Sequence, residues 1–207
     1  MRARTVEHPA ASSIPSARPG TGLAHRRFTR AEYERMVEAG ILDADERVEL
    51  LDGEIVPMSP QGDRHVLVVY RVAKLLEAAF GRGFFILTQS SHPLDDLSKP
   101  EPDVAVIRGA PEDYSGGRAR RAALVAEVAE TTLARDQLKA SLYARAHVPE
   151  YWLADLGRDE LIVHRAPRRS KPASHGWVYS DVATLARGRV RPLDARRSVA
   201  VARVFEL

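Results

Sequence analysis

The stretch LVAEVAE, residues 124–130, constrains the fold more than any other part of the sequence. Leu, Val and Ala follow one another without polar alternation, which is typical of a strand that is buried on both faces of a sheet. Glu127 interrupts this run, and an ionised carboxylate in such a place is costly unless a cation or hydrogen-bond donors compensate it. The stretch therefore predicts a central strand whose glutamate is either paired in the core or part of a functional site.

Helical and extended patterns alternate around this strand. Apolar residues recur at intervals of three and four over residues 62–80, which predicts an amphipathic helix that ends near Gly81. A second helix is expected from about residue 133 to residue 146. Strands are expected at FFILTQ, at PDVAVI from Pro102 onward, and at EYWLAD, LIVHRA and WVYS, with VAVARVF as a last strand. This alternation predicts an α/β fold built on a mixed (α+β) sheet.

A smaller helical and hairpin unit is expected before the long helix. Thr29 followed three residues later by Glu32 is a capping box, and Gly40 is placed to end the helix that it begins. Asp52 and Gly53 lie between two β-prone runs, which indicates a tight hairpin turn. Residues 1–24 are rich in Ala, Ser, Pro and Arg and are expected to be a disordered tail. Residues 25–207 are expected to form a single domain.

The composition limits the kinds of site that this chain can carry. The 207 residues include no cysteine, which excludes disulfides, thiolate zinc sites and cysteine nucleophiles. A metal would need oxygen or imidazole ligands, which favours a hard ion such as Mg²⁺ or Mn²⁺. No apolar run approaches the ~20 residues of a membrane span, and the first residues lack the apolar stretch of a signal peptide. We therefore expect a cytoplasmic protein without a membrane partner.

Asp103 is the second candidate site residue, because it opens the strand PDVAVI. Aspartate after proline is common in turns, so this residue alone indicates little. Strands that are consecutive in the sequence often neighbour each other in a sheet, however. Asp103 and Glu127 would then lie on adjacent strands, where two carboxylates can share one divalent ion.

Lys139 is the third candidate, on the helix that directly follows the Glu127 strand. We expect Leu138 and Leu142 to face the core and Lys139 to lie on another face, with Asp136 one turn before it and Tyr143 one turn after it. An isolated helical lysine is usually a solvated charge. A lysine beside a metal-activated water, by contrast, can steer the water and offset negative charge in the transition state.

Three quoted segments carry a family resemblance: PEPDVAVI, LVAEVAE and RDQLKASLYARAHVPEYWLAD. Together they resemble the PD-(D/E)XK nuclease superfamily and, more narrowly, the bacterial Uma family of restriction-type endonucleases. The hairpin RVELLDGEIVPMSP and His65 are similar to the opening of that family, and the resemblance covers roughly Phe28 to Arg165. It implies a restriction-endonuclease-like core in which Asp103 and Glu127 bind Mg²⁺, with Mn²⁺ as an alternative. Lys139 would then assist the water that cleaves a DNA phosphodiester.

The resemblance also has departures and further implications. The usual superfamily lysine lies two residues after the acidic residue, where this chain has Ala129, so Lys139 must supply it from the helix. Glu130 stands where related sequences have a serine-containing turn. Glu49 matches an early glutamate of the family, although a solvent-facing hairpin residue is the favoured interpretation from its neighbours. A homodimer is plausible by resemblance, because cutting both DNA strands usually calls for two sites.

Several alternatives remain open from the sequence. His65 either contacts phosphate or, as the favoured interpretation, has a structural role at the start of its helix. Asp136 either positions Lys139 or stabilises its helix N-terminus. The main alternative function is a non-catalytic nucleic-acid-binding or regulatory module on a nuclease fold. A further alternative is an enzyme that acts on RNA or another phosphate substrate through the same site.

Overall fold

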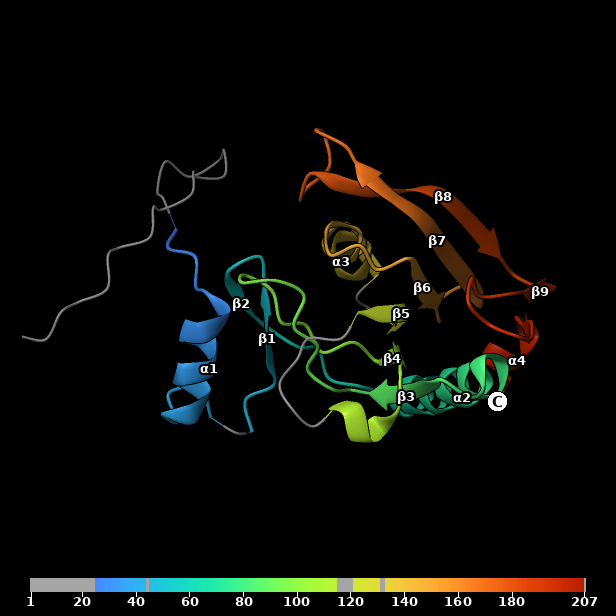
Figure 1. Ribbon diagram of the computed structural model, residues 1–207, viewed down its shortest axis with the longest axis horizontal. Helices are drawn as coiled ribbons and strands as arrows, with labels where there is room; N and C mark the ends of the chain where they lie inside the picture. The colour runs from blue at the N-terminus through green and yellow to red at the C-terminus, as the bar shows by residue number, and fades with distance from the viewer. Residues whose placement is uncertain (1–24, 44, 115–120, 131–132, 207) are drawn as a thin grey trace, which may run out of the picture.

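The computed structural model describes residues 25–43, 45–114, 121–130 and 133–206. Its centre is a six-stranded mixed sheet that has helices on both faces (Figure 1). This architecture confirms the predicted mixed α/β class. The tail predicted at residues 1–24 lies outside the described residues.

The helices and strands follow the alternation that the sequence predicted. The helices are α1 (Arg30–Glu38), α2 (Asp63–Phe80), α3 (Leu133–Arg145) and α4 (Ala202–Phe205), with a 3-10 turn at Pro111–Tyr114. The strands are β1 (Val48–Leu51), β2 (Glu54–Pro57), β3 (Phe84–Thr88), β4 (Val104–Arg108), β5 (Ala122–Ala129), β6 (Glu150–Asp155), β7 (Glu160–Arg169), β8 (Trp177–Leu185), β9 (Arg189–Val190) and β10 (Val199–Ala200).

The strand order of the main sheet is β3-β4-β5-β6-β7-β8. Strands β5 and β6 are parallel and are connected through α3, whereas every other neighbouring pair is antiparallel. A parallel pair needs such a crossover because a short turn cannot return the chain to the same end of the sheet. The expected neighbourhood of the Asp103 and Glu127 strands is confirmed, since β4 pairs with β5.

Two hydrophobic layers cover the sheet, one on each face. Helices α2 and α4 pack on one face and contact Leu124, Ala126 and Val128 of β5. Helix α3 packs on the other face, where Val125 and Ala129 of β5 contribute, and β7 and β8 bend over α3 (Figure 1). Strand β5 is buried along its whole length, as the LVAEVAE pattern predicted. Glu127 lies between Val125 and Ala129 in sequence alternation and therefore faces the α3 layer.

Several predicted strands differ in extent from the structure. Strands β7 and β8 are longer than predicted and extend to Arg169 and Leu185. Strand β4 begins at Val104 rather than Pro102, because proline has no amide hydrogen for the ladder and Asp103 uses its own amide elsewhere. The expected last strand is wrong over most of its length. Only Val199–Ala200 is extended, and the chain then turns into α4, whose Val204 and Phe205 pack against α2.

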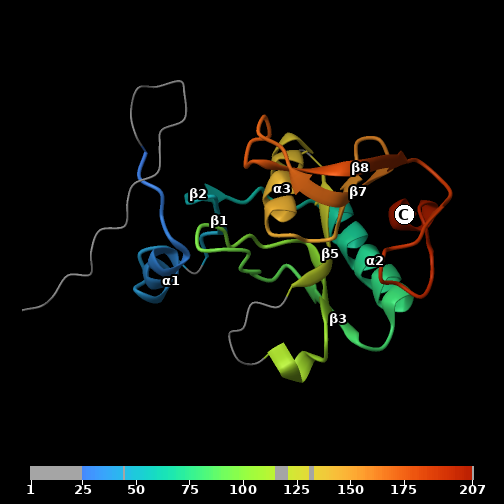
Figure 2. The ribbon, with the colours of Figure 1, turned by 45° about the horizontal axis from the view of Figure 1, so that its top comes forward.

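The N-terminal unit forms as predicted. Thr29 and Glu32 make both bonds of a capping box, and Gly40 follows α1 with a φ of 66°. Asp52 and Gly53 have φ angles of 50° and 84°, the left-handed values that a tight hairpin turn requires. Figure 2 shows the β1–β2 hairpin between α1 and the central strands. The hairpin is held there by backbone bonds from Gly53 to Leu97 and between Leu50 and Lys99.

Candidate functional site

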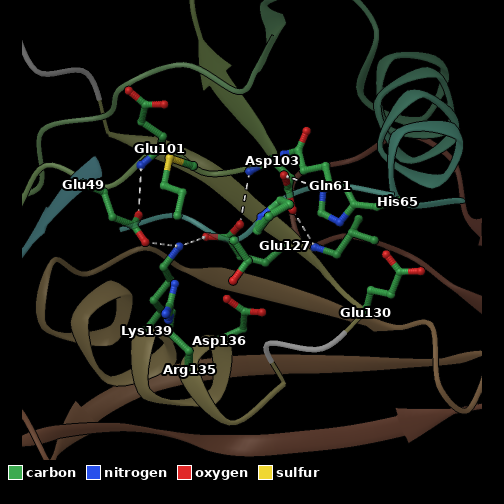
Figure 3. A pocket seen from close by; sticks show the side chains of 14 residues that line it. Glu49, Gln61, His65, Glu101, Asp103, Glu127, Glu130, Arg135, Asp136 and Lys139 are labelled. Carbon is green, nitrogen blue, oxygen red and sulfur yellow. Dashed lines mark hydrogen bonds and ion pairs between the residues drawn. The ribbon is translucent and has the colours of Figure 1, made fainter. Parts of the chain in front are cut away.

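A pocket rich in acidic side chains lies where the β1–β2 hairpin, the start of α2, strands β4 and β5, and α3 meet (Figure 3). All four predicted site residues line it. Its lining residues are Glu49, Met58, Ser59, Pro60, Gln61, His65, Glu101, Asp103, Glu127, Val128, Glu130, Arg135, Asp136 and Lys139. The pocket therefore contains six carboxylates and only two residues that are always cationic at neutral pH, so a cation is the ligand that its charge favours.

Asp103 and Glu127 lie side by side at the centre of the pocket. Val104 of β4 is opposite Ala126 of β5, so the antiparallel register sets Asp103 opposite Glu127. The Asp103 amide donates to Glu127 Oε2 over 3.2 Å, and the Val128 amide donates to Asp103 Oδ2 over 2.8 Å. Both side chains are buried, with exposed fractions of 6% and 3%. The two carboxylates are thus fixed by backbone donors of the neighbouring strand.

Lys139 reaches the same point from α3. Its Nζ lies 3.2 Å from Glu127 Oε1, and the residue is buried. The expected orientation of α3 is wrong in one respect, because Leu138 is 55% exposed. The inward face follows the helical period through Asp136, Lys139 and Tyr143, which are three and four residues apart. The polar pocket, rather than an apolar layer, meets this part of the helix.

Glu49 is the second partner of Lys139. The favoured interpretation of Glu49 as a solvent-facing hairpin residue is wrong, because its exposed fraction is 1%. Its Oε1 lies 3.0 Å from Lys139 Nζ, and its Oε2 accepts a bond from the Glu101 amide over 3.3 Å. The hairpin is buried on both faces at this position because it packs against the segment that leads into β4.

His65 contacts Asp103 from the first turn of α2. Its Nε2 lies 3.1 Å from Asp103 Oδ1, and the side chain is largely buried. Burial works to lower the pKa of His65, but the hydrogen bond and negative charge of Asp103 outweigh it and raise that pKa. His65 thus orients a central carboxylate, which is a different role from either capping the helix or contacting phosphate.

Tyr143 and Glu101 were not among the sequence candidates, and Asp136 and Glu130 were left open. The Tyr143 hydroxyl donates to Glu127 Oε1 over 2.9 Å. Its position one turn after Lys139 was the only available signal, since helix spacing places both on one face. Asp136 is 5% exposed and Glu130 is exposed at the pocket rim, so both carboxylates face the same space.

The pocket shifts the pKa values of Glu127 and Lys139. Burial raises the pKa of Glu127 to about 8, although the Lys139 ammonium works in the opposite direction, and Asp103 and Asp136 raise it further. Burial alone would lower the pKa of Lys139, but the charges of Glu127, Glu49 and Asp136 outweigh it and raise that pKa. Lys139 is therefore a fixed positive charge, whereas Glu127 becomes fully ionised at neutral pH only with additional positive charge nearby.

The carboxylate oxygens of the pocket are donors of the kind that a hard divalent cation prefers. In the described part of the chain, no group of three or more His, Asp or Glu side chains is placed so that it could hold a metal ion by itself. Mg²⁺ does not require one, because it is commonly bound by one or two carboxylates together with water and substrate phosphate oxygens. Asp103 and Glu127 supply two such carboxylates, and burial together with the neighbouring carboxylates raises the pKa of Glu127 despite the Lys139 ammonium.

The comparisons with known proteins show the family of this chain. Residues 30–194 match the Uma2 family, which is described as "Putative restriction endonuclease". The chain belongs to the Uma2 family. The match extends from α1 to beyond β9 and includes every residue of the pocket. A search of curated proteins finds no match.

A solved structure similar to this Uma2 chain is that of "a putative nuclease belonging to DUF820" from Anabaena variabilis ATCC 29413. The two share 13% sequence identity with a TM-score of 0.61, and the similarity covers 86% of this chain and 97% of the other. At this identity the likeness establishes that the two chains share a fold. The predicted restriction-endonuclease-like core is therefore confirmed.

Three further residues lie outside the pocket. Tyr151 and Trp152 pack in the core. Arg108, at the end of β4, forms an ion pair with Asp194. Among the described helices, none has the length and hydrophobicity needed to cross a bilayer.

Proposed function

We propose that this Uma2 protein is a metal-dependent endonuclease that hydrolyses phosphodiester bonds of DNA. The observation that carries the proposal is the meeting of Asp103, Glu127 and Lys139, from three different elements, in one acidic pocket. The family description and the nuclease fold of the neighbour support the same class of reaction. A homodimer that presents one pocket to each strand of a duplex belongs to the proposal.

Asp103 and Glu127 would hold Mg²⁺, or Mn²⁺ in its place. A bound divalent ion supplies positive charge to the scissile phosphate and lowers the pKa of water. The carboxylates are already fixed by the amides of Asp103 and Val128, so they need little rearrangement to receive the ion. His65 would keep the Asp103 carboxylate turned toward the pocket through its contact with Oδ1.

Lys139 would act as a positive hydrogen-bond donor rather than as a base. Its pKa is raised, so the ammonium keeps its proton at neutral pH. From its place beside Glu127, it can donate to the attacking water or to a phosphate oxygen and offset the negative charge that develops in the transition state. Glu49 would hold the ammonium in this position from the other side.

A specific observation also supports a non-catalytic alternative. Each oxygen of the Asp103 and Glu127 carboxylates already has a protein partner within hydrogen-bond distance. Such a network would also stabilise an inactive pocket in a nucleic-acid-binding module. The two functions differ in one measurement, since only the enzyme cleaves the DNA that it binds.

Cleavage of supercoiled plasmid in Mg²⁺, Mn²⁺ or EDTA tests the proposal. We expect metal-dependent nicking by the wild type and its loss in Asp103→Ala and Lys139→Ala proteins. Lys74→Ala is the matched control, because that lysine side chain is 58% exposed on α2, away from the pocket. Equal nicking by all four proteins would contradict the assigned site. DNA binding without cleavage by the wild type in either metal would favour the non-catalytic alternative.

A further inference from the structure

A second charged cluster lies outside the pocket and joins five separate segments of the chain. Its members are Arg27, Asp52, Asp95, Ser98, Arg145 and His175, which we call the Asp52 cluster. The segments are the chain before α1, the β1–β2 turn and the loop before β4, together with the C-terminal end of α3; His175 adds the β7–β8 connection. None of the six residues lines the pocket.

Arg145 is the centre of this cluster. Its Nη1 lies 2.7 Å from Asp52 Oδ1, and its Nη2 lies 2.8 Å from Asp95 Oδ2 and 3.1 Å from Ser98 Oγ. One guanidinium therefore binds the hairpin turn and the loop before β4 at the same time. The rigid fork of arginine donors suits such a junction because it fixes the relative orientation of its partners.

Asp52 receives further contacts on its other atoms. Arg27 donates to its carbonyl oxygen over 2.7 Å and pairs with its carboxylate, and His175 Nδ1 lies 3.3 Å from Oδ2. Burial would raise the pKa of Asp52, but its bonds to His175 and Arg145 and the arginine charges hold that pKa well below its usual range. The turn residue is therefore an anion that stays charged at all ordinary pH values.

Three of the segments joined by the cluster also carry a residue of the pocket. Glu49 lies three residues before Asp52 on the hairpin, and Asp103 follows Ser98 by five residues. Lys139 precedes Arg145 by six residues on α3, which is about 9 Å along the helix axis. The pocket contact between Glu49 and Lys139 thus joins the same two elements as the Arg145–Asp52 pair, at a different height along α3.

We propose that Arg145 and Asp52 are positioning residues that hold the hairpin against α3, so that Glu49 keeps Lys139 beside Glu127. The catalytic consequence rests on the proposed nuclease function, whereas the positional consequence does not. Without the cluster, polar contacts still join the hairpin to α3 through the Glu49–Lys139 pair and the bond from Arg135 to the Pro57 carbonyl. Both lie toward the N-terminal part of α3, so the end of the hairpin at Asp52 would be released and the Lys139 ammonium would gain freedom to leave the pocket. A displacement of about 1 Å at a reacting group is enough to slow chemistry strongly.

Amine labelling measures the position of Lys139 without any need for activity. The chain has only four lysines, at 74, 99, 139 and 171, so each labelled site is separately quantifiable by mass spectrometry. In the wild type we expect slow acetylation of Lys139, because its side chain is 6% exposed, and fast acetylation of Lys74. In Arg145→Gln protein we expect Lys139 to be labelled several-fold faster, with the rate at Lys74 unchanged.

Arg165→Gln is the matched control. Arg165 pairs with the buried Glu150 over 2.7 Å, and its side chain is 24% exposed, the same fraction as that of Arg145. Arg145→Gln loses ion pairs to two carboxylates and Arg165→Gln loses one, in both cases from a guanidinium of equal exposure. Arg165, however, joins β7 to β6 and has no contact with the hairpin. Equal labelling of Lys139 in the two variants would overturn the proposal. Asp52→Asn removes the same junction with a smaller change and replaces Arg145→Gln if that variant does not fold.

Kinetics on plasmid DNA separate the two proposals. If the wild type cleaves, we expect Arg145→Gln to lower kcat with little change in KM, and Arg165→Gln to change neither. If the wild type cleaves no substrate, the proposed function fails, while the labelling of Lys139 still decides the role of the cluster. A kcat of Arg145→Gln equal to that of Arg165→Gln, with equal labelling, would show that the cluster only stabilises the fold.

Discussion

Asp103 and Glu127 fix each other through an exchange of bonds between their strands. The amide of Asp103 donates to the Glu127 carboxylate, and the amide next to Glu127 donates to the Asp103 carboxylate (Figure 3). The exchange depends on antiparallel pairing that sets the two residues opposite each other. The two carboxylates are therefore anchored at the end of the β4–β5 ladder.

Replacement of Lys139 by methionine should slow cleavage without weakening DNA binding greatly. The side chain keeps its length and loses the charge that would offset the transition state, so we expect kcat to fall by roughly 10²–10³-fold. Single-turnover plasmid nicking measures the effect, and Lys74→Met controls for the loss of a lysine. A kcat within a factor of about three of the wild type would exclude an electrostatic role for Lys139.

Replacement of His65 should weaken metal binding more than it weakens the fold. His65 orients Asp103 through Oδ1, and the loss of such an orienting partner typically costs 10–100-fold in metal affinity. We expect His65→Phe to show this loss in a Mn²⁺ titration, and His65→Gln to recover part of it through its amide donor. Equal affinity in all three proteins would mean that Val128 alone fixes Asp103.

Glu127 should reduce the stability of the metal-free protein as the pH rises. Burial raises its folded-state pKa from 4.5 to about 8, so the folded protein holds a proton that the unfolded chain loses within this range. The contribution of the protonated Glu127 to the free energy of unfolding is therefore fully present below its unfolded-state pKa. It is lost as the pH rises toward and through the folded-state pKa. In EDTA, the Tm of Glu127→Gln should rise relative to the wild type between about pH 5 and pH 8.

Two controls accompany this pH measurement. Glu77→Gln removes a carboxylate whose side chain is 61% exposed, so its Tm should run parallel to that of the wild type. Added Mg²⁺ should reduce the difference between Glu127→Gln and the wild type, because a bound cation favours the ionised carboxylate. If the Tm of all three proteins changed with pH in the same way in EDTA, the raised pKa of Glu127 would be contradicted.

The hairpin turn should tolerate no side chain at Gly53. An added Cβ would lie 2.6 Å from Arg27 Cβ and 3.2 Å from its Cα, and the φ of 84° is itself strained for other residues. Gly40→Ala is the control, because its φ is 66° but no atom lies within 4 Å of the added Cβ. We expect Gly40→Ala to cost roughly 1–2 kcal/mol in urea unfolding. Gly53→Ala should lower the free energy of unfolding by more than this. An equal loss in the two variants would show that the turn or Arg27 can move to make room for the added methyl group.

The sequence predicted the secondary structure of the core well, because local patterns determine it. The unbroken apolar run of β5, the spacing of α2 and the capping box of α1 each follow from the residues themselves. The failures lie where tertiary contacts override such patterns. VAVARVF reads as a strand, but its apolar residues pack against α2 more effectively as a short helix.

The candidate site was predictable in part. Glu127 was identifiable because a carboxylate in an apolar strand needs an explanation, and Asp103 followed from the tendency of consecutive strands to pair. Glu49 and His65 were assigned less specific roles. Their partners, Lys139 and Asp103, are 90 and 38 residues away in the chain, and no local pattern encodes a contact over such a separation.

The sequence by itself determined the elements, the buried carboxylate and the absence of thiolate chemistry, since these depend on residue type and spacing. Tertiary structure alone decided that α3 turns Lys139 inward and Leu138 outward, and that the hairpin covers Lys139 with Glu49. The physical reason is that a buried charge is stable only beside its counter-charge. The counter-charges of Lys139 come from two strands that only the fold brings together.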